Sequence, residues 1–391
     1  MRDNTIEAFF ALVRAGLFPV YGEGFKINES LFRDVEWKKV YQLAKEQSVQ
    51  GLVLAGLEQY KNLNVNFDVN QKLLLQWIGE VQMIEQRNKA MNLFIAELVQ
   101  SMRKMGIYTL LVKGQGIAQC YERPLWRACG DVDFFLSNDD YPKAKDYLVP
   151  LASYVETEGV YGKHLGMVVN GWNVELHGSL RCGLSNRVDN ELEDVVIDTF
   201  NNGNVRSWND DGVQVFMLGA ENDAFYVFNH FLEHFYKGGT GLRQICDWCR
   251  LLWKHRDTLN QNKLEARIRK AGLLNEWMAF GAFAVTYLGM PVEAMPLLDA
   301  RCKKEDGRCE VDANLSKKAD KICSFILEVG NFGHNRDISY YQKHSYLAQK
   351  CISAWRRLKD LCRHARIFPI SSVRFFFVIM WNGFVSAVRG E

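Results

Sequence analysis

The sequence of 391 residues is poor in proline, with only 7. Proline ends helices and is common in irregular linkers, so its scarcity favours a helix-rich chain with short connections. The net charge is also small, at +2 with histidine neutral. A charge of this size does not by itself indicate nucleic-acid binding. The chain has no repeat of fixed period and no low-complexity tract, and its 48% hydrophobic and 24% charged residues are typical of a soluble globular protein.

The sequence shows neither the pattern of a secretory signal nor that of a membrane-spanning segment. The N-terminal stretch has acidic residues early and no long uncharged apolar run. The most apolar segment, 375–388, has 14 residues between Arg374 and Arg389, which is too short for a comfortable membrane span. We expect a buried terminal helix there, with an interfacial helix as the alternative.

The ten cysteines lack the spacing of a disulfide framework, so we expect reduced thiols and a cytoplasmic protein. Cys246 and Cys249 form a CxxC motif, and a zinc site there would need His230 and His234 as its second ligand pair. Phenylalanine follows His230, so the HExxH pattern of zinc proteases is absent. Packing of the two cysteines inside an apolar helix is the preferred interpretation.

Apolar periodicity divides the chain into three parts. Spacings of three and four predict helices at 37–60 and 71–105, with Gly106 as a C-cap glycine. Short apolar runs with β-branched residues predict strands at 107–112, 131–136, 164–169, 172–177 and 213–217. Asn170-Gly171 predicts a hairpin between the third and fourth of these strands. Helical spacing returns at 223–236, 242–255 and 263–287.

This order predicts an α+β protein. A small mixed sheet would occupy residues 106–219, with a helical N-terminal region at 1–105 and a helical C-terminal region at 220–391.

Three acidic residues have the strand positions needed for a shared site. Asp131 and Asp133 are separated by one apolar residue, so their side chains point to the same face of a strand. Glu175 lies within another strand, between apolar neighbours. Adjacent carboxylates repel unless a cation or water separates them, and hard oxygen ligands suit Mg²⁺. The ordinary alternative is that these acidic side chains are simply solvated charges on the protein surface.

Lys113 and Gly114 end the strand that precedes Asp131. Glycine at such a point lets the backbone approach phosphate oxygens closely. The Lys113 ammonium group could add a positive charge for a triphosphate.

The stretch 110–136 resembles the signature of an uncharacterised bacterial nucleotidyltransferase family within the polymerase-beta-like superfamily. The matching positions are Lys113-Gly114, Tyr121, Pro124, Arg127, Gly130-Asp131-Val132-Asp133, Glu175-Leu176-His177, His230, His234, Arg243 and Asp247. The resemblance spans about residues 110–252. The sequence departs from the superfamily at Gly114-Gln115, where Gly-Gly or Gly-Ser is usual, and in the 16 residues between Gly114 and Asp131, a longer spacing than the commonest one.

The resemblance implies metal-dependent transfer of a nucleoside monophosphate from an NTP to an acceptor hydroxyl, with release of pyrophosphate. Asp131, Asp133 and Glu175 would be catalytic and would bind Mg²⁺; two ions are expected, with Mn²⁺ as an alternative. Glu175 would also help to deprotonate the acceptor. The nucleotide-binding candidates are Lys113, Gly114, Gln115 and Arg127. The acceptor-side candidates are His177, His230, His234, Arg243 and Asp247.

Several alternatives stay open at this point. A small-molecule acceptor is favoured over RNA or protein, and a non-catalytic nucleotide-binding or scaffolding protein with the same fold is the rival function. Arg127 could instead pair with Glu122, and Arg243 with Asp247 one helical turn away. The three histidines could be structural. The segment from Tyr341 onward contains nine Lys or Arg residues but only two acidic residues. These could form a solvated helix face, or a surface for RNA or anionic lipid.

Overall fold

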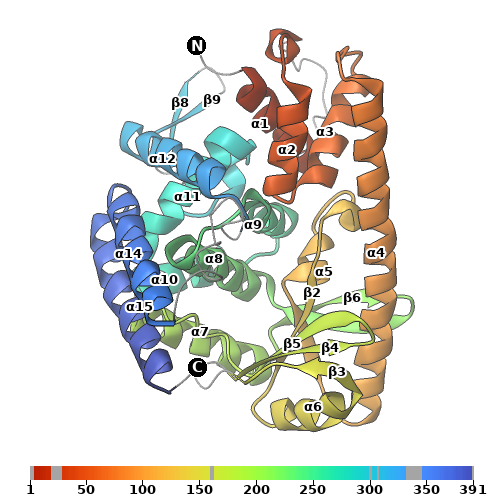
Figure 1. The fold of residues 1–391 in the computed structure, drawn as a ribbon, viewed down its shortest axis with the longest axis vertical. Coiled ribbons are helices and arrows are strands. Elements are labelled where there is room, and N and C mark those ends of the chain that lie inside the picture. Colours follow the sequence, from red (N-terminus) through yellow and green to blue (C-terminus); the bar gives the residue numbers. More distant parts are fainter. Residues whose placement is uncertain are drawn as a thin grey trace.

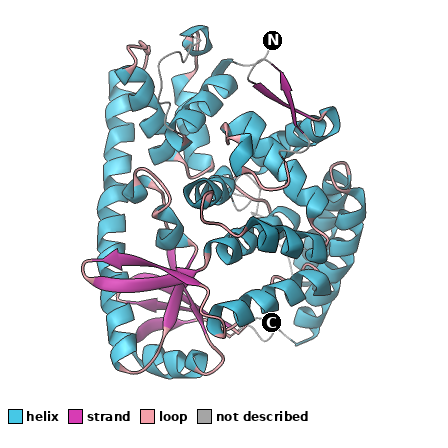
Figure 2. Cartoon of the chain, turned by 180° about the vertical axis from the view of Figure 1, so that it is seen from behind, coloured by secondary structure: helices cyan, strands magenta, loops and turns pink. Residues whose placement is uncertain are grey.

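A computed structural model of the chain describes residues 4–18, 29–158, 163–298, 302–305, 308–331 and 346–389. Helices make up most of it, and the strands gather into one seven-stranded sheet and one separate pair. Figure 1 shows the N-terminal helices above the sheet and the C-terminal helices beside it. In the opposite view the seven strands lie together at one end of the molecule (Figure 2). The expected α+β class is confirmed.

The N-terminal region contains four α-helices, namely α1 (Asn4–Leu17), α2 (Trp37–Glu46), α3 (Gln50–Asn62) and α4 (Gln71–Lys104). The single helix expected over 37–60 is therefore wrong. It is interrupted at Ser48, whose backbone has a φ of +55°. The 34-residue α4 runs beside both the N-terminal helices and the sheet (Figure 1). Gly106, just beyond its end, has a φ of +70°, as expected of a C-cap glycine.

The seven strands are β1 (Thr109–Val112), β2 (Asp131–Leu136), β3 (Ala152–Val155), β4 (His164–Val169), β5 (Trp172–His177), β6 (Val205–Asp210) and β7 (Val213–Leu218). Their order in the sheet is β3-β4-β5-β2-β1-β7-β6. β2 is parallel to β5 and β1 to β7, whereas the other neighbouring pairs are antiparallel. Asn170 and Gly171 both have positive φ and close the expected hairpin.

The outer strands β3 and β6 were not expected from the sequence. Both lie at sheet edges, and residues of β6 alternate between exposed and half-buried. An edge strand with polar side chains buries little surface, so it lacks the apolar run that marks a central strand.

The sheet has two different faces because its side chains alternate. Val132 and Phe134 of β2 pack with apolar residues of α4 and α6 (Asp140–Leu148) in one core cluster. Asp131 and Asp133, which alternate with them along the strand, therefore point to the opposite face. Residues of α5 (Gly114–Ala118) and α8 (Ala220–Lys237) line cavities with these acids on that face. Apolar burial on the first face thus fixes the direction of the acids on the second.

The C-terminal helical region begins with α8 and continues with α9 (Leu242–His255), α10 (Gln261–Ala271), α11 (Leu274–Leu288), α12 (Ala313–Val329), α14 (Tyr346–Ala365) and α15 (Pro369–Arg389). The helix expected over 263–287 is in fact two, separated at Gly272 with a φ of +72°. Elements not expected from the sequence are α7 (Asn186–Phe200), the β8–β9 pair (Cys302–Glu305 and Arg308–Val311) and the 3-10 helices η1 (Glu29–Phe32), η2 (Pro124–Trp126), η3 (Val149–Leu151) and η4 (Val292–Ala294).

The terminal helix α15 is only partly buried. Phe375 and Ile379 are 2% and 8% exposed, whereas Phe377 and Trp381 are 67% and 65% exposed. The expectation of a buried helix therefore holds for one face alone. Among the described residues, no helix combines the length and the hydropathy needed to cross a bilayer.

The two cysteines of the CxxC motif lie on α9 and are fully buried. Neither belongs to a cluster of metal-ligating side chains within the described part of the chain. Their surroundings include Trp248 and other apolar residues of the main core, which agrees with the packing interpretation.

Gly51 of α3 permits a close approach between the N-terminal helices and the loop that leads to β2. A Cβ at this position would lie 2.1 Å from the carbonyl oxygen of Trp126. Gly79 of α4 offers a matched contrast, because a Cβ there would meet no atom within 4 Å.

We predict opposite effects of Gly→Ala at these two helical positions. Gly51→Ala should lower the free energy of unfolding by about 1–3 kcal/mol or more, because backbone must move to admit the methyl group. Gly79→Ala should raise it by up to about 1 kcal/mol through helix propensity alone. Urea unfolding of both variants measures these changes. Equal stability of the two variants would contradict the close approach at Gly51.

Candidate active site

The parallel pairing of β2 with β5 brings the three predicted carboxylates together. Asp133 lies directly opposite Glu175 in the ladder, and Asp131 opposite Asn173. Carboxylate oxygens of Asp131, Asp133 and Glu175 all lie within 4.8 Å of one another. The expected convergence on one face of the sheet is therefore present in the structure. Oxygens at this separation could share a divalent cation.

Lys113 supplies the nearest positive charge. Its Nζ lies 2.6 Å from Oδ1 of Asp133, and its backbone has a φ of +57°. A non-glycine residue in this region is uncommon and is often found at functional sites. Burial opposes the charged form of Lys113, but the charge and hydrogen bond of Asp133, together with the charges of Tyr226 and Glu175, raise the pKa of the ammonium group. Lys113 is therefore a permanent cation beside the acids.

The three carboxyl groups have different environments. Burial, and then the charges of Asp133 and Glu175, raise the pKa of Asp131 above its ordinary value. Burial also disfavours ionisation of Glu175, yet hydrogen bonds from His164 and His177 outweigh it and lower its pKa. The Nε2 atoms of these histidines lie 3.1 and 3.4 Å from Oε2 of Glu175. His177 also lies 2.9 Å from Oδ1 of Asp133, so it bridges two of the acids.

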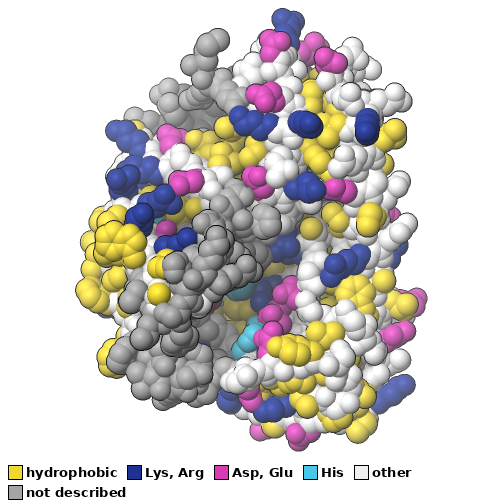
Figure 3. All heavy atoms as spheres, in the orientation of Figure 1, with side chains coloured by type: hydrophobic (Ala, Val, Ile, Leu, Met, Phe, Trp, Pro, Cys, Tyr) yellow, Lys and Arg dark blue, Asp and Glu magenta, His cyan; other side chains and the backbone are white. Residues whose placement is uncertain are grey.

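Two adjoining cavities meet at this cluster. The larger, of about 440 Å³, is lined by Lys113, Asp131 and Glu175 from the sheet and its strand ends, and by His230 and His234 from α8. The smaller, of about 60 Å³, is lined by residues that include Gly114, Asp133, Arg127, Arg243 and Asp247. Figure 3 shows histidine, acidic and basic side chains gathered in the hollow between α8 and the sheet.

The α8 wall of the larger cavity carries paired histidines. The rings of His230 and His234 are 4.6 Å apart. Burial, and then the charge of Lys113, lower the pKa of His230 well below its ordinary value and that of His234 to about 4. Both imidazoles are therefore neutral near pH 7, and each can donate one hydrogen bond and accept another.

Asp247 of α9 is held by residues of the loop before β2. Arg127 donates to both of its carboxylate oxygens, from Nε at 2.8 Å and from a terminal nitrogen at 2.6 Å, and the Tyr121 hydroxyl donates to Oδ1 at 2.8 Å. Arg243 instead donates to the carbonyl of Ala128. The alternative pairs Arg243–Asp247 and Arg127–Glu122 are thus replaced by a buried link between α9 and the sheet module, while Glu122 pairs with Arg250.

Gln115 occupies a different place from the other nucleotide-side candidates. It is 1% exposed, and its side-chain amide donates to Oδ1 of Asn88 on α4 at 2.8 Å. Its side chain is therefore used in packing and does not line either cavity at the carboxylates. Lys113, Gly114 and Arg127 do line them.

Sequence reasoning missed several residues that line the larger cavity, among them His164, Ser179, Arg181, Tyr226, Asn229 and Glu233. A signal for His164 was present. Pairing across the two-residue Asn170-Gly171 turn places His164 directly opposite His177. The α8 residues Tyr226, Asn229 and Glu233 gave no such signal, because only tertiary packing turns them towards the sheet.

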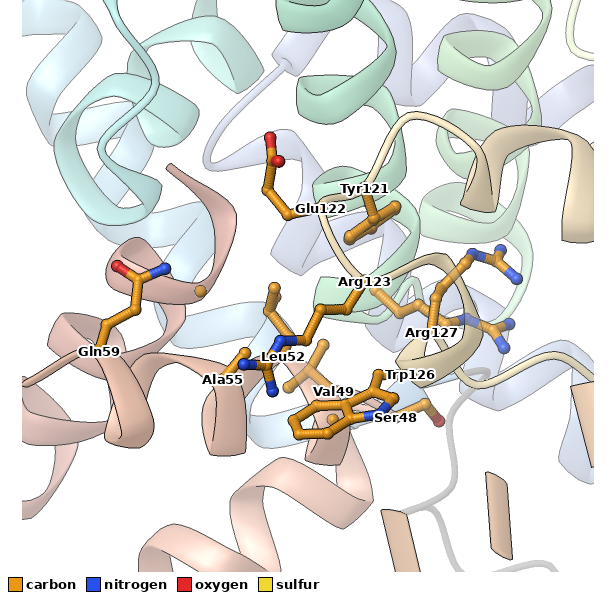
Figure 4. A pocket seen from close by; sticks show the side chains of 13 residues that line it. Ser48, Val49, Leu52, Ala55, Gln59, Tyr121, Glu122, Arg123, Trp126 and Arg127 are labelled. Atoms are coloured by element: carbon orange, nitrogen blue, oxygen red, sulfur yellow. The ribbon is translucent and has the colours of Figure 1, made fainter. Parts of the chain in front are cut away.

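A third cavity lies between α3 and η2, and Figure 4 shows its lining. The Arg123 guanidinium lies 4.2 Å from the centre of the Trp126 ring and pairs with Glu58. The cavity is about 60 Å³, and its lining comes mainly from small and apolar residues of 48–55 and from residues within 121–127. None of the three carboxylates reaches it, so it is separate from the acidic cluster.

Comparison with known families gives one match. A family model described as "Uncharacterised nucleotidyltransferase" matches residues 33–289, which include the whole sheet and the helices from α2 to α11. No curated protein and no solved structure matches the chain.

The Arg127–Asp247 pair yields a prediction on stability. Removing either partner leaves a buried charge without its counter-ion, so Arg127→Ala and Asp247→Ala should each lower the free energy of unfolding by about 3–5 kcal/mol. The double variant should lose less than the sum of the two, because neither charge then remains. Urea unfolding of the four proteins measures the coupling.

The exposed pair Arg181–Glu193 serves as the matched control. Its side chains are 54% and 44% exposed. The same set of single and double variants at this pair should give a coupling energy of at most about 1 kcal/mol. Additive losses at Arg127 and Asp247 would show that the two side chains act separately.

Proposed function

The chain belongs to a family of uncharacterised nucleotidyltransferases, and from this premise we propose that it transfers a nucleoside monophosphate from an NTP to a hydroxyl group of an acceptor. The observation that carries the proposal is the convergence of Asp131, Asp133 and Glu175 at a cavity that also contains Lys113. This arrangement supplies carboxylate ligands and a phosphate-directed cation in one place.

The donor set fits Mg²⁺, or Mn²⁺ as an alternative. Three carboxylates offer hard oxygen ligands, and the raised pKa of Asp131 reflects burial and the repulsion that a cation would relieve. Two bound ions would neutralise phosphate charge and lower the pKa of the attacking hydroxyl. Asp131 and Asp133 would hold both ions, and Glu175 would complete the set at the acceptor side.

The nucleotide side is assigned to Lys113, Gly114 and the smaller cavity. Lys113 forms an ion pair with Asp133. With the carboxylates neutralised by metal, its ammonium group would turn to a phosphate oxygen. Gly114 has a φ of +41°, and Arg243 lines the same cavity. Arg127 would contribute indirectly, because Asp247 already occupies its guanidinium group.

In the proposed reaction the acceptor oxygen attacks the α-phosphorus of the NTP. A new phosphorus–oxygen bond forms, the bond from the α-phosphorus to the oxygen that bridges to the β-phosphate breaks, and pyrophosphate leaves with that electron pair. Glu175 accepts the proton of the acceptor hydroxyl, and His164 keeps the Glu175 carboxylate oriented by its hydrogen bond. The chain contributes mainly positioning and charge.

A small polar molecule is the acceptor that the larger cavity favours. Its volume of about 440 Å³ is in the range of small-ligand sites. Neutral His230 and His234 offer hydrogen bonds without adding positive charge, which suits hydroxyl groups better than a second polyphosphate. RNA and protein acceptors rank second. A non-catalytic scaffold is disfavoured because all three carboxylates and the lysine are present together.

We predict that Asp133→Asn lowers nucleotidyl transfer by about a thousandfold or more, because the amide keeps the side-chain volume but removes a metal-binding charge. The measurement incubates the protein with each α-labelled NTP, Mg²⁺ and a host-cell extract, and follows labelled product and pyrophosphate. The melting temperature should change by only a few degrees.

Asp146→Asn is the control, because it makes the same chemical change at an exposed position on α6. It should label the extract like the parent chain. Labelling that persists in Asp133→Asn at the parent rate would overturn the metal assignment, and absence of any labelling by the parent would favour the scaffold.

A further inference from the structure

A second group of potential metal ligands lies beside the three carboxylates. One ligand atom from each of His164, Glu175 and His177 lies within 4.8 Å of the others. Two of these ligands are nitrogens, whereas the carboxylate group formed with Asp131 and Asp133 offers oxygen alone. The difference in donor chemistry separates the two groups.

Strand geometry fixes this second group. His164 and His177 face each other directly across the β4–β5 ladder, and their ring centres are 4.8 Å apart. Glu175 precedes His177 by two residues on β5, so its side chain leaves the sheet on the same face. All three ligands therefore stand on one antiparallel hairpin, closed by a two-residue turn. Such a scaffold holds them independently of α8 and α9.

The interatomic distances suit a small transition-metal ion. Nε2 of His164 and Nε2 of His177 lie 3.1 and 3.4 Å from Oε2 of Glu175. Ligands about 2.0–2.2 Å from a tetrahedral Zn²⁺ are separated by roughly 3.4 Å. A modest opening of the hydrogen-bonded group would therefore admit the ion. The side chains of His164 and Glu175 are 39% and 29% exposed, so the site is open to the cavity and to a fourth ligand.

We propose that His164, Glu175 and His177 form a site for a transition-metal cation of the Zn²⁺ or Co²⁺ class. Imidazole nitrogens favour these ions, whereas Mg²⁺ prefers oxygen ligands. The hairpin thus adds a cation preference that the three-carboxylate group lacks.

Glu175 belongs to both groups, which has a consequence that rests on the proposed function. A cation held by the two histidines draws Glu175 away from Asp131 and Asp133. It also removes His177 from Asp133, to which its Nε2 lies at 2.9 Å. Zn²⁺ should therefore inhibit Mg²⁺-dependent transfer, whereas Mn²⁺, which prefers oxygen ligands, should support transfer at the carboxylates.

The test uses Co²⁺ alone with the purified full-length chain and no nucleotide. Binding of Co²⁺ with four or five ligands at such a site gives an intense visible absorption band that the hydrated ion lacks. The band is titrated to obtain an affinity, and Zn²⁺ should abolish it by displacement. In His164→Gln the amide still donates to Glu175 but is a poor metal ligand. We expect the affinity of this variant to fall by about tenfold or more, with a melting temperature close to that of the parent.

Two further variants show whether Co²⁺ binds at the two histidines or at the three carboxylates. His255→Gln alters a histidine outside both groups and should bind Co²⁺ like the parent. Asp131→Asn weakens the carboxylate group alone and should keep the Co²⁺ band. Loss of the band in Asp131→Asn together with its retention in His164→Gln would overturn the proposal, as would the absence of any band in the parent. Because no nucleotide is present, this result is independent of whether transfer occurs.

Discussion

Mutual repulsion among Asp131, Asp133 and Glu175 is the constraint around which the rest of the site is arranged. Three carboxylates on one side of a sheet are stable only if positive charge or hydrogen-bond donors surround them. Lys113 and His177 contact Asp133, and His164 contacts Glu175. The apolar face of the same strands packs on α4 and α6, so the acids have no other direction in which to point. Core packing therefore stabilises a charge arrangement that would otherwise oppose folding.

Local patterns in the sequence predicted the central strands of the sheet. They did not predict the features that depend on tertiary contacts. β2, β4 and β5 begin and end as expected, because alternating or apolar runs and the Asn170-Gly171 turn mark them. Helical periodicity continues across Ser48 and Gly272, so the two breaks were missed. The partner of Asp247 is Arg127, 120 residues earlier in the chain, and no local spacing indicates such a pair. The hydrogen-bond partner of Gln115, Asn88, likewise lies on α4, and no local spacing indicates that contact.

The region that matches the family ends at residue 289, within the C-terminal helices. Helices α12, α14 and α15 lie beyond it, yet they pack on the core side of α8. Phe235 contacts Phe325 and His364, and Tyr236 contacts Phe375. The same helix presents His230 and His234 to the cavity. These later helices thus support α8 from the side away from the carboxylates. Among their described residues, none lines the larger cavity.

The Arg127–Asp247 link has a consequence for how this chain can be divided or can diverge. A fragment that ends after the sheet would carry Arg127 without Asp247, and an isolated helical fragment would carry Asp247 alone. Each fragment would then contain a charged side chain that is buried in the whole chain but lacks its counter-ion in the fragment. Autonomous folding of the sheet is therefore disfavoured, although it has its own apolar core. In an alignment of relatives the two positions should covary, since a lineage that lost one charge would gain by losing the other.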